Sequence, residues 1–301
     1  MINFLFMVAC STEVGLIGYT EKGQDTSENN TIIEVSDEPS SEPSSEPSLE
    51  PSDDPVIEGV GGYVNYYLRQ VACPACVGES QEMLVEFKTR FHEPTSDSHV
   101  SWIPEVGTCT NQLLVTVPST NPIDIGPEVN VEGPYHSFTA NRTTVGEHYA
   151  YLYETQYDRN ASHDVSLSAY DETFLFTSIE GFDYIEPWNM LYVDPSYAFD
   201  AAILKSGMTF SWGPYGSSGV FMITIAAYNQ QGNQLLGYAA CVGPDQGYLT
   251  FPGAYLSAFP AGSLAVIHLA RHKVQTVPYA PLNSYIETHM EWEVVGTGYL
   301  Q

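Results

Sequence analysis

The chain has 301 residues, 43% of them hydrophobic, and a formal net charge of −28 that comes from 37 Asp and Glu residues against 9 Lys and Arg. So acidic a chain repels phosphate backbones and anionic lipid headgroups, which argues against nucleic-acid binding and against electrostatic docking on a membrane. The region from residue 56 onward is long enough for one large β domain or for two sandwiches of ordinary size.

The amino-terminus combines a short apolar run, residues 2–8, with a small residue and then a cysteine. Met7-Val8-Ala9-Cys10 resembles the lipobox of bacterial lipoproteins, whose cysteine is lipidated and becomes the first residue of the mature protein. The resemblance implies that residues 1–10 are a signal and that Cys10 carries the lipid. Ser11 after the cysteine implies the outer membrane, with the protein facing the periplasm or the cell exterior. The alternative is an ordinary cysteine in a frayed terminus.

Residues 11–55 consist mainly of Ser, Glu, Asp, Pro and Thr, and Glu-Pro-Ser recurs every four residues from Glu38 to Glu50. Twelve acids against one Lys give this segment a formal charge of −11, which leaves −17 of the −28 on the rest of the chain. Such a composition cannot bury enough apolar surface to order itself. The segment is therefore predicted to be a disordered linker, and directly after a lipid anchor it would act as a stalk.

Apolar and polar residues alternate along most of the remaining chain, which predicts strands. The clearest case is residues 285–294, where Ile286 to Val294 at every second position predict one buried face. The residues between them are Tyr285, Glu287, His289, Glu291 and Glu293. Residues 220–228 and 235–241 flank Asn229 to Asn233 and predict a hairpin. Further strands are expected at residues 62–72, 83–91, 113–117, 128–132, 137–143, 148–157, 164–169, 208–212 and 263–273.

Many short strands punctuated by Gly, Pro and Asn predict an all-β fold with two antiparallel β-sandwich modules after the linker, at residues 56–190 and 191–301. In the second region Thr209-Phe210-Ser211-Trp212 leads into the predicted hairpin, and Asp245-Gln246-Gly247 and Phe251-Pro252 follow it. This rhythm is similar to immunoglobulin-like and fibronectin-like modules of bacterial surface proteins. The similarity implies a spacer, an adhesive unit or a ligand-binding domain, and fold alone does not choose among them.

Four cysteines remain beside Cys10, and in an exported chain an even number predicts disulfides. The four candidates are Cys73, Cys76, Cys109 and Cys241. We expect Cys109 to pair with Cys73 or Cys76 and Cys241 to be free and buried. Cys73-Pro74-Ala75-Cys76 also resembles the redox motif of thiol oxidoreductases, but a predicted strand follows it where that family has a helix.

Two further groups of residues are candidate ligand sites. Asp158, Asn160 and Asp164 offer oxygen ligands for calcium in one loop, without the spacing of an EF-hand, so we expect either no cofactor or calcium. Tyr149, Tyr151 and Tyr153 share one face of a predicted strand and, with Trp188, could stack on sugar rings. Tyr157 is on the same face as these tyrosines. The residues on the opposite face of the strand are more polar, so the pattern favours core packing of the tyrosines.

The leading hypothesis is a lipid-anchored cell-envelope protein that displays β-sandwich modules for binding, adhesion or assembly, without catalytic activity. Its partners would be the membrane, through the lipid, and a protein or glycan. A carbohydrate-binding lipoprotein that uses the exposed tyrosines is the first alternative. An exported hydrolase with paired carboxylates, or a thiol oxidoreductase, is the second.

Overall fold

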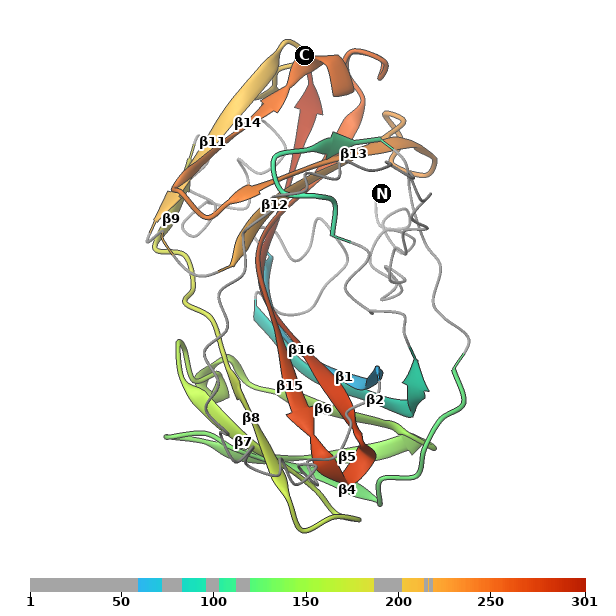
Figure 1. Cartoon of the computed structure of the whole chain (residues 1–301). Helices are drawn as coiled ribbons and strands as arrows, with labels where there is room; N and C mark the ends of the chain where they lie inside the picture. The colour runs from blue at the N-terminus through green and yellow to red at the C-terminus, as the bar shows by residue number, and fades with distance from the viewer. Residues whose placement is uncertain are drawn as a thin grey trace, which may run out of the picture.

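The computed structural model describes residues 59–71, 83–95, 103–111, 120–186, 202–213, 216 and 219–301. Within these ranges the chain forms strands and three short 3₁₀ turns, and no α-helix, which confirms the all-β, antiparallel sandwich class (Figure 1). The strands are β1 (Val60–Val71), β2 (Met83–Thr95), β3 (Cys109–Thr110), β4 (Glu128–Glu132), β5 (Ser137–Thr144), β6 (Glu147–Leu152), β7 (Ser162–Leu167), β8 (Thr173–Thr177), β9 (Tyr184–Glu186), β10 (Ala202–Ile203), β11 (Gly207–Gly213), β12 (Val220–Tyr228), β13 (Leu235–Pro244), β14 (Tyr248–Pro252), β15 (Leu264–Tyr279) and β16 (Ser284–Leu300). The 3₁₀ turns are η1 (Glu154–Gln156), η2 (Gly253–Tyr255) and η3 (Ala280–Leu282).

Most strands belong to one 13-stranded sheet in the order β3-β13-β12-β15-β16-β1-β2-β6-β5-β4-β7-β8, with β10 beside β16. Its pairs are antiparallel except for β1 with β16 and β10 with β16. β1 and β16 come from the two regions predicted as separate modules, so this sheet crosses the expected boundary near residue 190, and the division into domains stays a prediction. A smaller sheet, β14-β11-β9, packs against β12, where Trp212 stacks on Phe221 with ring centroids 3.4 Å apart.

The hairpin of β15 and β16 runs along the molecule and joins its two ends (Figure 1). These are the longest strands, of 16 and 17 residues, and they pair along their whole length from Leu264 with Tyr299 to Tyr279 with Ser284. The turn between them contains Asn283 at φ 47°, a left-handed conformation that Asn tolerates better than most residues. Other strands pair with the hairpin at both of its edges, so it lies in the middle of the large sheet.

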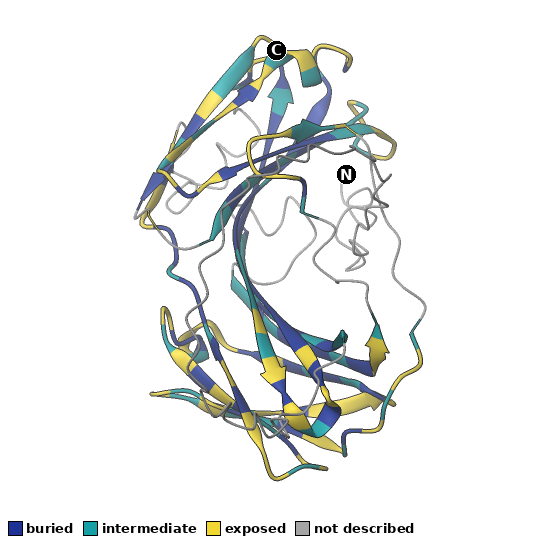
Figure 2. Cartoon of the chain, viewed as in Figure 1, coloured by how far each residue is buried: buried dark blue, intermediate teal, exposed yellow. Residues whose placement is uncertain are grey.

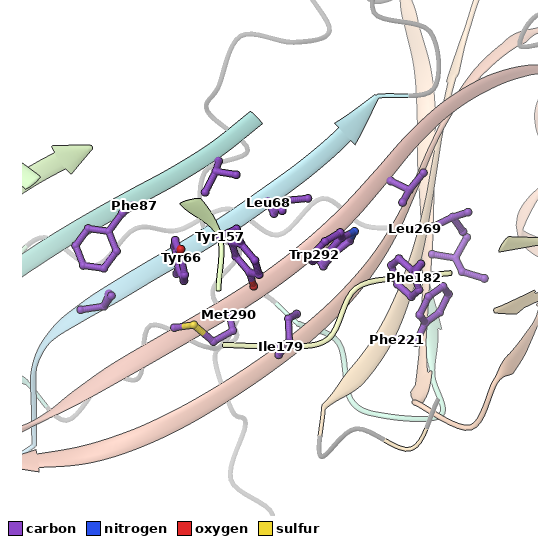
Figure 3. Close-up of a cluster of buried hydrophobic side chains, with 14 of the residues drawn as sticks. Tyr66, Leu68, Phe87, Tyr157, Ile179, Phe182, Phe221, Leu269, Met290 and Trp292 are labelled. Carbon is purple, nitrogen blue, oxygen red and sulfur yellow. The ribbon is translucent and has the colours of Figure 1, made fainter. Parts of the chain in front are cut away.

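One face of the hairpin packs on the hydrophobic core. Met290 and Trp292 of β16 are buried there with Tyr66 of β1 and Phe87 of β2 (Figure 3). Tyr157, which follows η1, stacks on Tyr66 at 4.7 Å between ring centroids and contacts the Trp292 ring edge-on at 5.4 Å. Such aromatic pairs contribute about 0.5–1.5 kcal/mol each beyond the area that they bury. The core therefore fixes which residues of β1, β2 and β16 point away from it.

The disulfide differs from the expected pairing. Cys109 of β3 is bonded to Cys241 of β13, and the two residues are direct neighbours in the ladder between these strands. The sequence predicts that Cys109 pairs with Cys73 or Cys76 and that Cys241 is free. Both predictions are wrong. β3 pairs with β13 at the edge of the large sheet, and Cys241 follows Cys109 by 132 residues along the chain. The tertiary fold, and not the local sequence, therefore decides this pairing. Cys73 and Cys76 lie outside the described residues.

Candidate functional site: the polar face of the central sheet

The second face of β16 is also buried over most of its length, so the expectation of one buried face is wrong here (Figure 2). Glu287, His289 and Glu293 are all buried, and pairing registers continue this surface across β15, β1, β2 and β6. We call it the polar face. It comprises His268 and His272 of β15, Glu287, His289, Glu291 and Glu293 of β16, Tyr63, Asn65, Tyr67 and Arg69 of β1, Glu86, Lys88 and Arg90 of β2, and Glu147, Tyr149 and Tyr151 of β6.

Strand pairing aligns these side chains in rows that cross the sheet. One row contains His272, Glu291, Tyr67, Glu86 and Tyr151, from β15 to β6. Paired residues on one face of a sheet have Cβ atoms about 4.5–5.5 Å apart, so neighbouring members of the row are close enough to interact. His272 on β15 is buried, Glu291, Tyr67 and Glu86 on β16, β1 and β2 are intermediate, and Tyr151 on β6 is exposed. The polar face therefore opens toward solvent on its β6 side.

Glu293 is the centre of the most tightly connected part of the polar face. The Tyr67 hydroxyl donates a hydrogen bond to Glu293 Oε2, Arg69 Nε lies 3.1 Å from the same oxygen, and His268 Nδ1 contacts Oε1. Burial acts to raise the pKa of Glu293, but His268, Arg69 and the Tyr67 hydroxyl outweigh it and hold the pKa well below its ordinary value. Glu293 is therefore an ionised carboxylate despite a side chain that is only 8% exposed.

Glu291 is two residues away on the same face and has the opposite tendency. Burial and the negative charge of Glu293 raise its pKa well above the ordinary value for Glu. His272 Nδ1 lies 3.5 Å from Glu291 Oε2, and burial lowers the pKa of His272 to about 3. Burial therefore disfavours the charged form of both groups in this contact. The polar face thus holds side by side two carboxyl groups whose pKa values are shifted in opposite directions.

The outer part of the polar face, on β2 and β6, carries the predicted tyrosines. Tyr149 donates a hydrogen bond of 3.0 Å to Glu86 Oε1, and Lys88 lies 5.6 Å from the centre of the Tyr149 ring and 2.8 Å from Glu86 Oε2. Burial and the Glu86 charge raise the pKa of Tyr149, so its hydroxyl remains a donor. Tyr151 is 43% exposed, and Tyr153, directly after β6, is 71% exposed.

The expectation that these tyrosines pack in the core is wrong for Tyr149, Tyr151 and Tyr153. His148, Ala150 and Leu152 point to the core instead, and only Tyr157, beyond the end of the strand, is buried. His148 is accommodated there because its Nε2 lies 3.0 Å from the Gly126 carbonyl oxygen. Trp188, the fourth predicted stacking residue, lies outside the described residues, as does Cys10.

The calcium candidates do not converge on one site. Both oxygens of Asp158 are occupied, because Oδ2 accepts the backbone N–H groups of Tyr135 and His136 and Oδ1 lies 2.6 Å from His136 Nδ1. Asn160 is in a turn with φ 47°, and Asp164 is exposed on β7. Among the described residues, no three His, Cys, Asp or Glu side chains form a group that could hold a metal ion. Asp158 instead ties the turn before β5 to the segment before β7.

No family model matches this chain, and no curated protein matches its sequence. In the part of the chain that the structure describes, no helix has the length and apolar character needed to cross a membrane. The chemistry of the polar face is therefore the observation from which a function can be argued.

Proposed function

We propose that this chain is a lipid-anchored cell-envelope protein whose β-sandwich binds a neutral carbohydrate through the polar face. The row from Glu291 through Tyr67 and Glu86 to Tyr151 carries the proposal. Sugar hydroxyls require hydrogen-bond acceptors and donors together, and the carboxyl, phenol and guanidinium groups of the polar face supply both. The tyrosine rings add flat apolar surface on which the C–H face of a sugar can rest.

The charge of the polar face favours a neutral ligand. It has five carboxyl groups, on Glu86, Glu147, Glu287, Glu291 and Glu293, against three cations, on Arg69, Lys88 and Arg90. Each cation is already close to a carboxylate: Arg69 to Glu293, Lys88 to Glu86 and Arg90 to Glu147. A phosphorylated, sulfated or uronic-acid polymer would meet an acidic surface with no uncommitted positive charge among the cations just named. Neutral hexose, pentose and N-acetylhexosamine polymers avoid this repulsion.

The location rests on the amino-terminal sequence and on the disulfide. A Cys109–Cys241 bond persists in oxidising compartments, which supports export. Cys10 and the acidic linker at residues 11–55 would then hold the sandwich away from the outer membrane. Mass spectrometry of the natively expressed protein tests this part. A diacylated or triacylated Cys10 at the mature amino-terminus is expected, and an unmodified Met1 would contradict the anchor.

Affinity electrophoresis tests the binding proposal. The purified chain is run through native gels that contain β-glucan, xylan, mannan or glycol chitin, and through gels that contain alginate or heparin as anionic polymers. We expect one or more neutral polymers to retard the chain, and the anionic polymers to leave its mobility unchanged. Retardation by the anionic polymers alone would contradict a neutral ligand, and no retardation in any gel would contradict carbohydrate binding.

A further inference from the structure

The small sheet of β9, β11 and β14 has one face in the core and one in solvent (Figure 1). Ile185, Phe210, Trp212 and Phe251 on the first face are completely buried. The second face, which we call the outer face, consists of Tyr184 and Glu186 of β9, Thr209 and Ser211 of β11, and Tyr248 and Thr250 of β14. We propose that the outer face is a second carbohydrate-binding surface, on which the flat chains of a β-linked glucan or of chitin lie. It shares no residue with the polar face, so the proposal does not depend on binding there.

The two tyrosines of the outer face are exposed on a sheet that already has its core. Tyr248 is 55% exposed and Tyr184 is 43% exposed. Rings left in water contribute little to folding, because the free energy of apolar burial scales with the area removed from water. Tyrosine is instead enriched at binding surfaces, since its ring supplies contact area and its hydroxyl a hydrogen bond. The outer face therefore has the composition of a binding surface.

The middle strand keeps the outer face shallow. Gly213 pairs with Tyr184 and Ser211 pairs with Tyr248, so a small residue of β11 lies beside each ring. A Cβ at Gly213 would be only 2.5 Å from Tyr184 Cε1, because the Tyr184 ring lies over this strand instead of standing away from it. The two rings thus flank β11 with small residues between them. An extended sugar chain can lie across such a surface without entering a cleft.

The polar atoms of the outer face suit a neutral ligand. The three strands contain one carboxylate, on Glu186, and no Lys, Arg or His. Ser211 donates a hydrogen bond of 3.4 Å to Glu186 Oε2, and the hydroxyls of Thr209 and Thr250 pair at 2.8 Å. These groups can donate to and accept from the hydroxyls at the edge of a stacked sugar ring. An anionic polymer would find no positive charge on these strands and would meet a chain with a formal charge of −28.

The same charge argues against a second copy of the chain as the occupant. A dimer with twofold symmetry places one patch against itself, so the two Glu186 carboxylates would approach each other. Each chain also carries the full formal charge of −28, and like charges repel at close approach. A neutral polymer has no such cost. The outer face therefore fits a sugar chain better than it fits itself.

Stacking on an aromatic ring discriminates among neutral polysaccharides. In β-linked chains of glucose or N-acetylglucosamine, the hydroxyl and acetamido groups lie around the edge of each ring, which leaves only hydrogen atoms on its two faces. These polymers are consequently flat ribbons with apolar faces, and contact of an apolar face with an aromatic ring is favourable. Dextran has α-linked glucose units joined through a flexible carbon and forms no such ribbon. We expect stronger binding to β-glucan or chitin than to dextran.

The sheet beneath the outer face holds it in place. Trp212 stacks on Phe221 of β12 with 3.4 Å between ring centroids, and its Nε1 donates a hydrogen bond of 2.6 Å to Asp245. A surface that is ordered before the ligand arrives loses less conformational entropy on binding. Because these contacts are on the buried side, substitution of Tyr184 or Tyr248 leaves them intact. Such variants should therefore fold as the wild type does.

Affinity electrophoresis in gels that contain hydroxyethyl cellulose, glycol chitin or dextran tests the proposal, and mobilities at several polymer concentrations give dissociation constants. Tyr184→Ala and Tyr248→Ala should each weaken binding about three- to tenfold, and the double variant at least about tenfold, because stacked rings are lost. Tyr184→Phe and Tyr248→Phe keep the rings and should bind nearly as well as the wild type. Tyr135→Ala, at a tyrosine that is 83% exposed outside both surfaces, is the matched control. Urea unfolding of each variant verifies its fold.

The outcomes separate the outer face from the polar face. Tyr151→Ala removes an exposed ring of the polar face only. Weak binding by the Tyr184→Ala, Tyr248→Ala double variant with normal binding by Tyr151→Ala would support the outer face and refute the polar face. The reverse result would refute the outer face and leave carbohydrate binding at the polar face intact. A lack of retardation in every gel would refute both.

Two further results would overturn the assignment of the outer face. Equal retention by dextran would show that it does not select a flat chain. Sedimentation velocity of the wild type and the Tyr184→Ala, Tyr248→Ala double variant, without polysaccharide, tests self-association. We expect a monomer in both cases. A wild-type dimer that the double variant fails to form would assign the outer face to contact between copies of the chain.

Discussion

Arg271 and Asp245 form an ion pair that the protein encloses completely. Arg271 Nε lies 3.0 Å from Asp245 Oδ2, and the two side chains are 1% and 0% exposed. Arg271 also donates hydrogen bonds to the carbonyl oxygens of Glu180 and Gly181, at 2.7 and 2.9 Å, and Trp212 Nε1 donates to Asp245 Oδ1 at 2.6 Å. One charge pair thus joins the β15–β16 hairpin, the small sheet and the segment between β8 and β9.

Removal of one partner of this pair should destabilise the fold strongly. Asp245→Asn leaves the buried Arg271 charge without its counterion, which costs about 3–5 kcal/mol in comparable buried pairs. The free energy of unfolding, measured by urea denaturation of wild type and variant, checks this value.

The exposed pair of Arg159 and Glu154 gives the matched control, because its atoms are 3.9 Å apart and its side chains are 47% and 49% exposed. Glu154→Gln should change the unfolding free energy by less than about 1 kcal/mol. Equal losses in Asp245→Asn and Glu154→Gln would show that burial of the Arg271–Asp245 pair has no energetic consequence.

The disulfide should also contribute measurably to stability. The Cys109–Cys241 bond closes a long loop, and native disulfides of this kind contribute about 2–5 kcal/mol. The double variant Cys109→Ser, Cys241→Ser should lose stability in that range when its urea unfolding is compared with that of the oxidised wild type.

Peptide mapping of the non-reduced protein checks the pairing on which this prediction depends. A single peptide pair that links Cys109 to Cys241 is expected. Recovery of Cys109 in a bond to Cys73 or Cys76 would instead restore the pairing that the sequence predicts.

Asp158 predicts a specific dependence of stability on pH. Burial acts to raise the pKa of Asp158, but the hydrogen bonds from His136 and from the backbone of Tyr135 and His136 outweigh it and lower the pKa. A carboxyl with a lowered pKa in the folded state stabilises the protein above its unfolded pKa, about 3.9, and this contribution is lost as pH falls through the folded pKa.

The unfolding free energies of wild type and Asp158→Asn should therefore differ most at neutral pH. Their difference should be constant from about pH 7 to pH 5 and should shrink as the pH falls below about 4. A difference that does not change with pH would mean that the charge of Asp158 plays no part in stability.

Local alternation was enough to predict most strands of this fold. The expected strand at residues 128–132 coincides with β4, and the hairpin of β12 and β13 forms where the turn residues predict it. The parallel pairing of β1 with β16 and the bond between Cys109 and Cys241 join segments far apart in sequence. Such contacts depend on which sheet edges meet in the folded chain, and no local pattern encodes that.

The polar face was missed because period-two alternation assigns one face of a strand to the core and leaves the other to solvent. On β16 the second face is buried by tertiary packing, so Glu287, His289 and Glu293 appear as surface residues in the sequence. A signal was present: four titratable residues occupy successive alternate positions from Glu287 to Glu293, opposite a strongly apolar face. For Tyr149 and Tyr151 the strand was expected to run to Tyr157, so Glu154 and Gln156 made the face of His148 the more polar one. The strand ends at Leu152, and the face of His148 is the buried one.

Calorimetric titration with the neutral oligosaccharide selected by affinity electrophoresis tests binding at the polar face most directly. Tyr151→Ala should weaken the affinity at least about tenfold, or roughly 1.4 kcal/mol, because a stacking ring is removed. Tyr135→Ala, at a tyrosine that is 83% exposed in the turn before β5, should bind as the wild type does. Equal affinities of wild type, Tyr151→Ala and Glu293→Gln would show that the polar face is not the binding site.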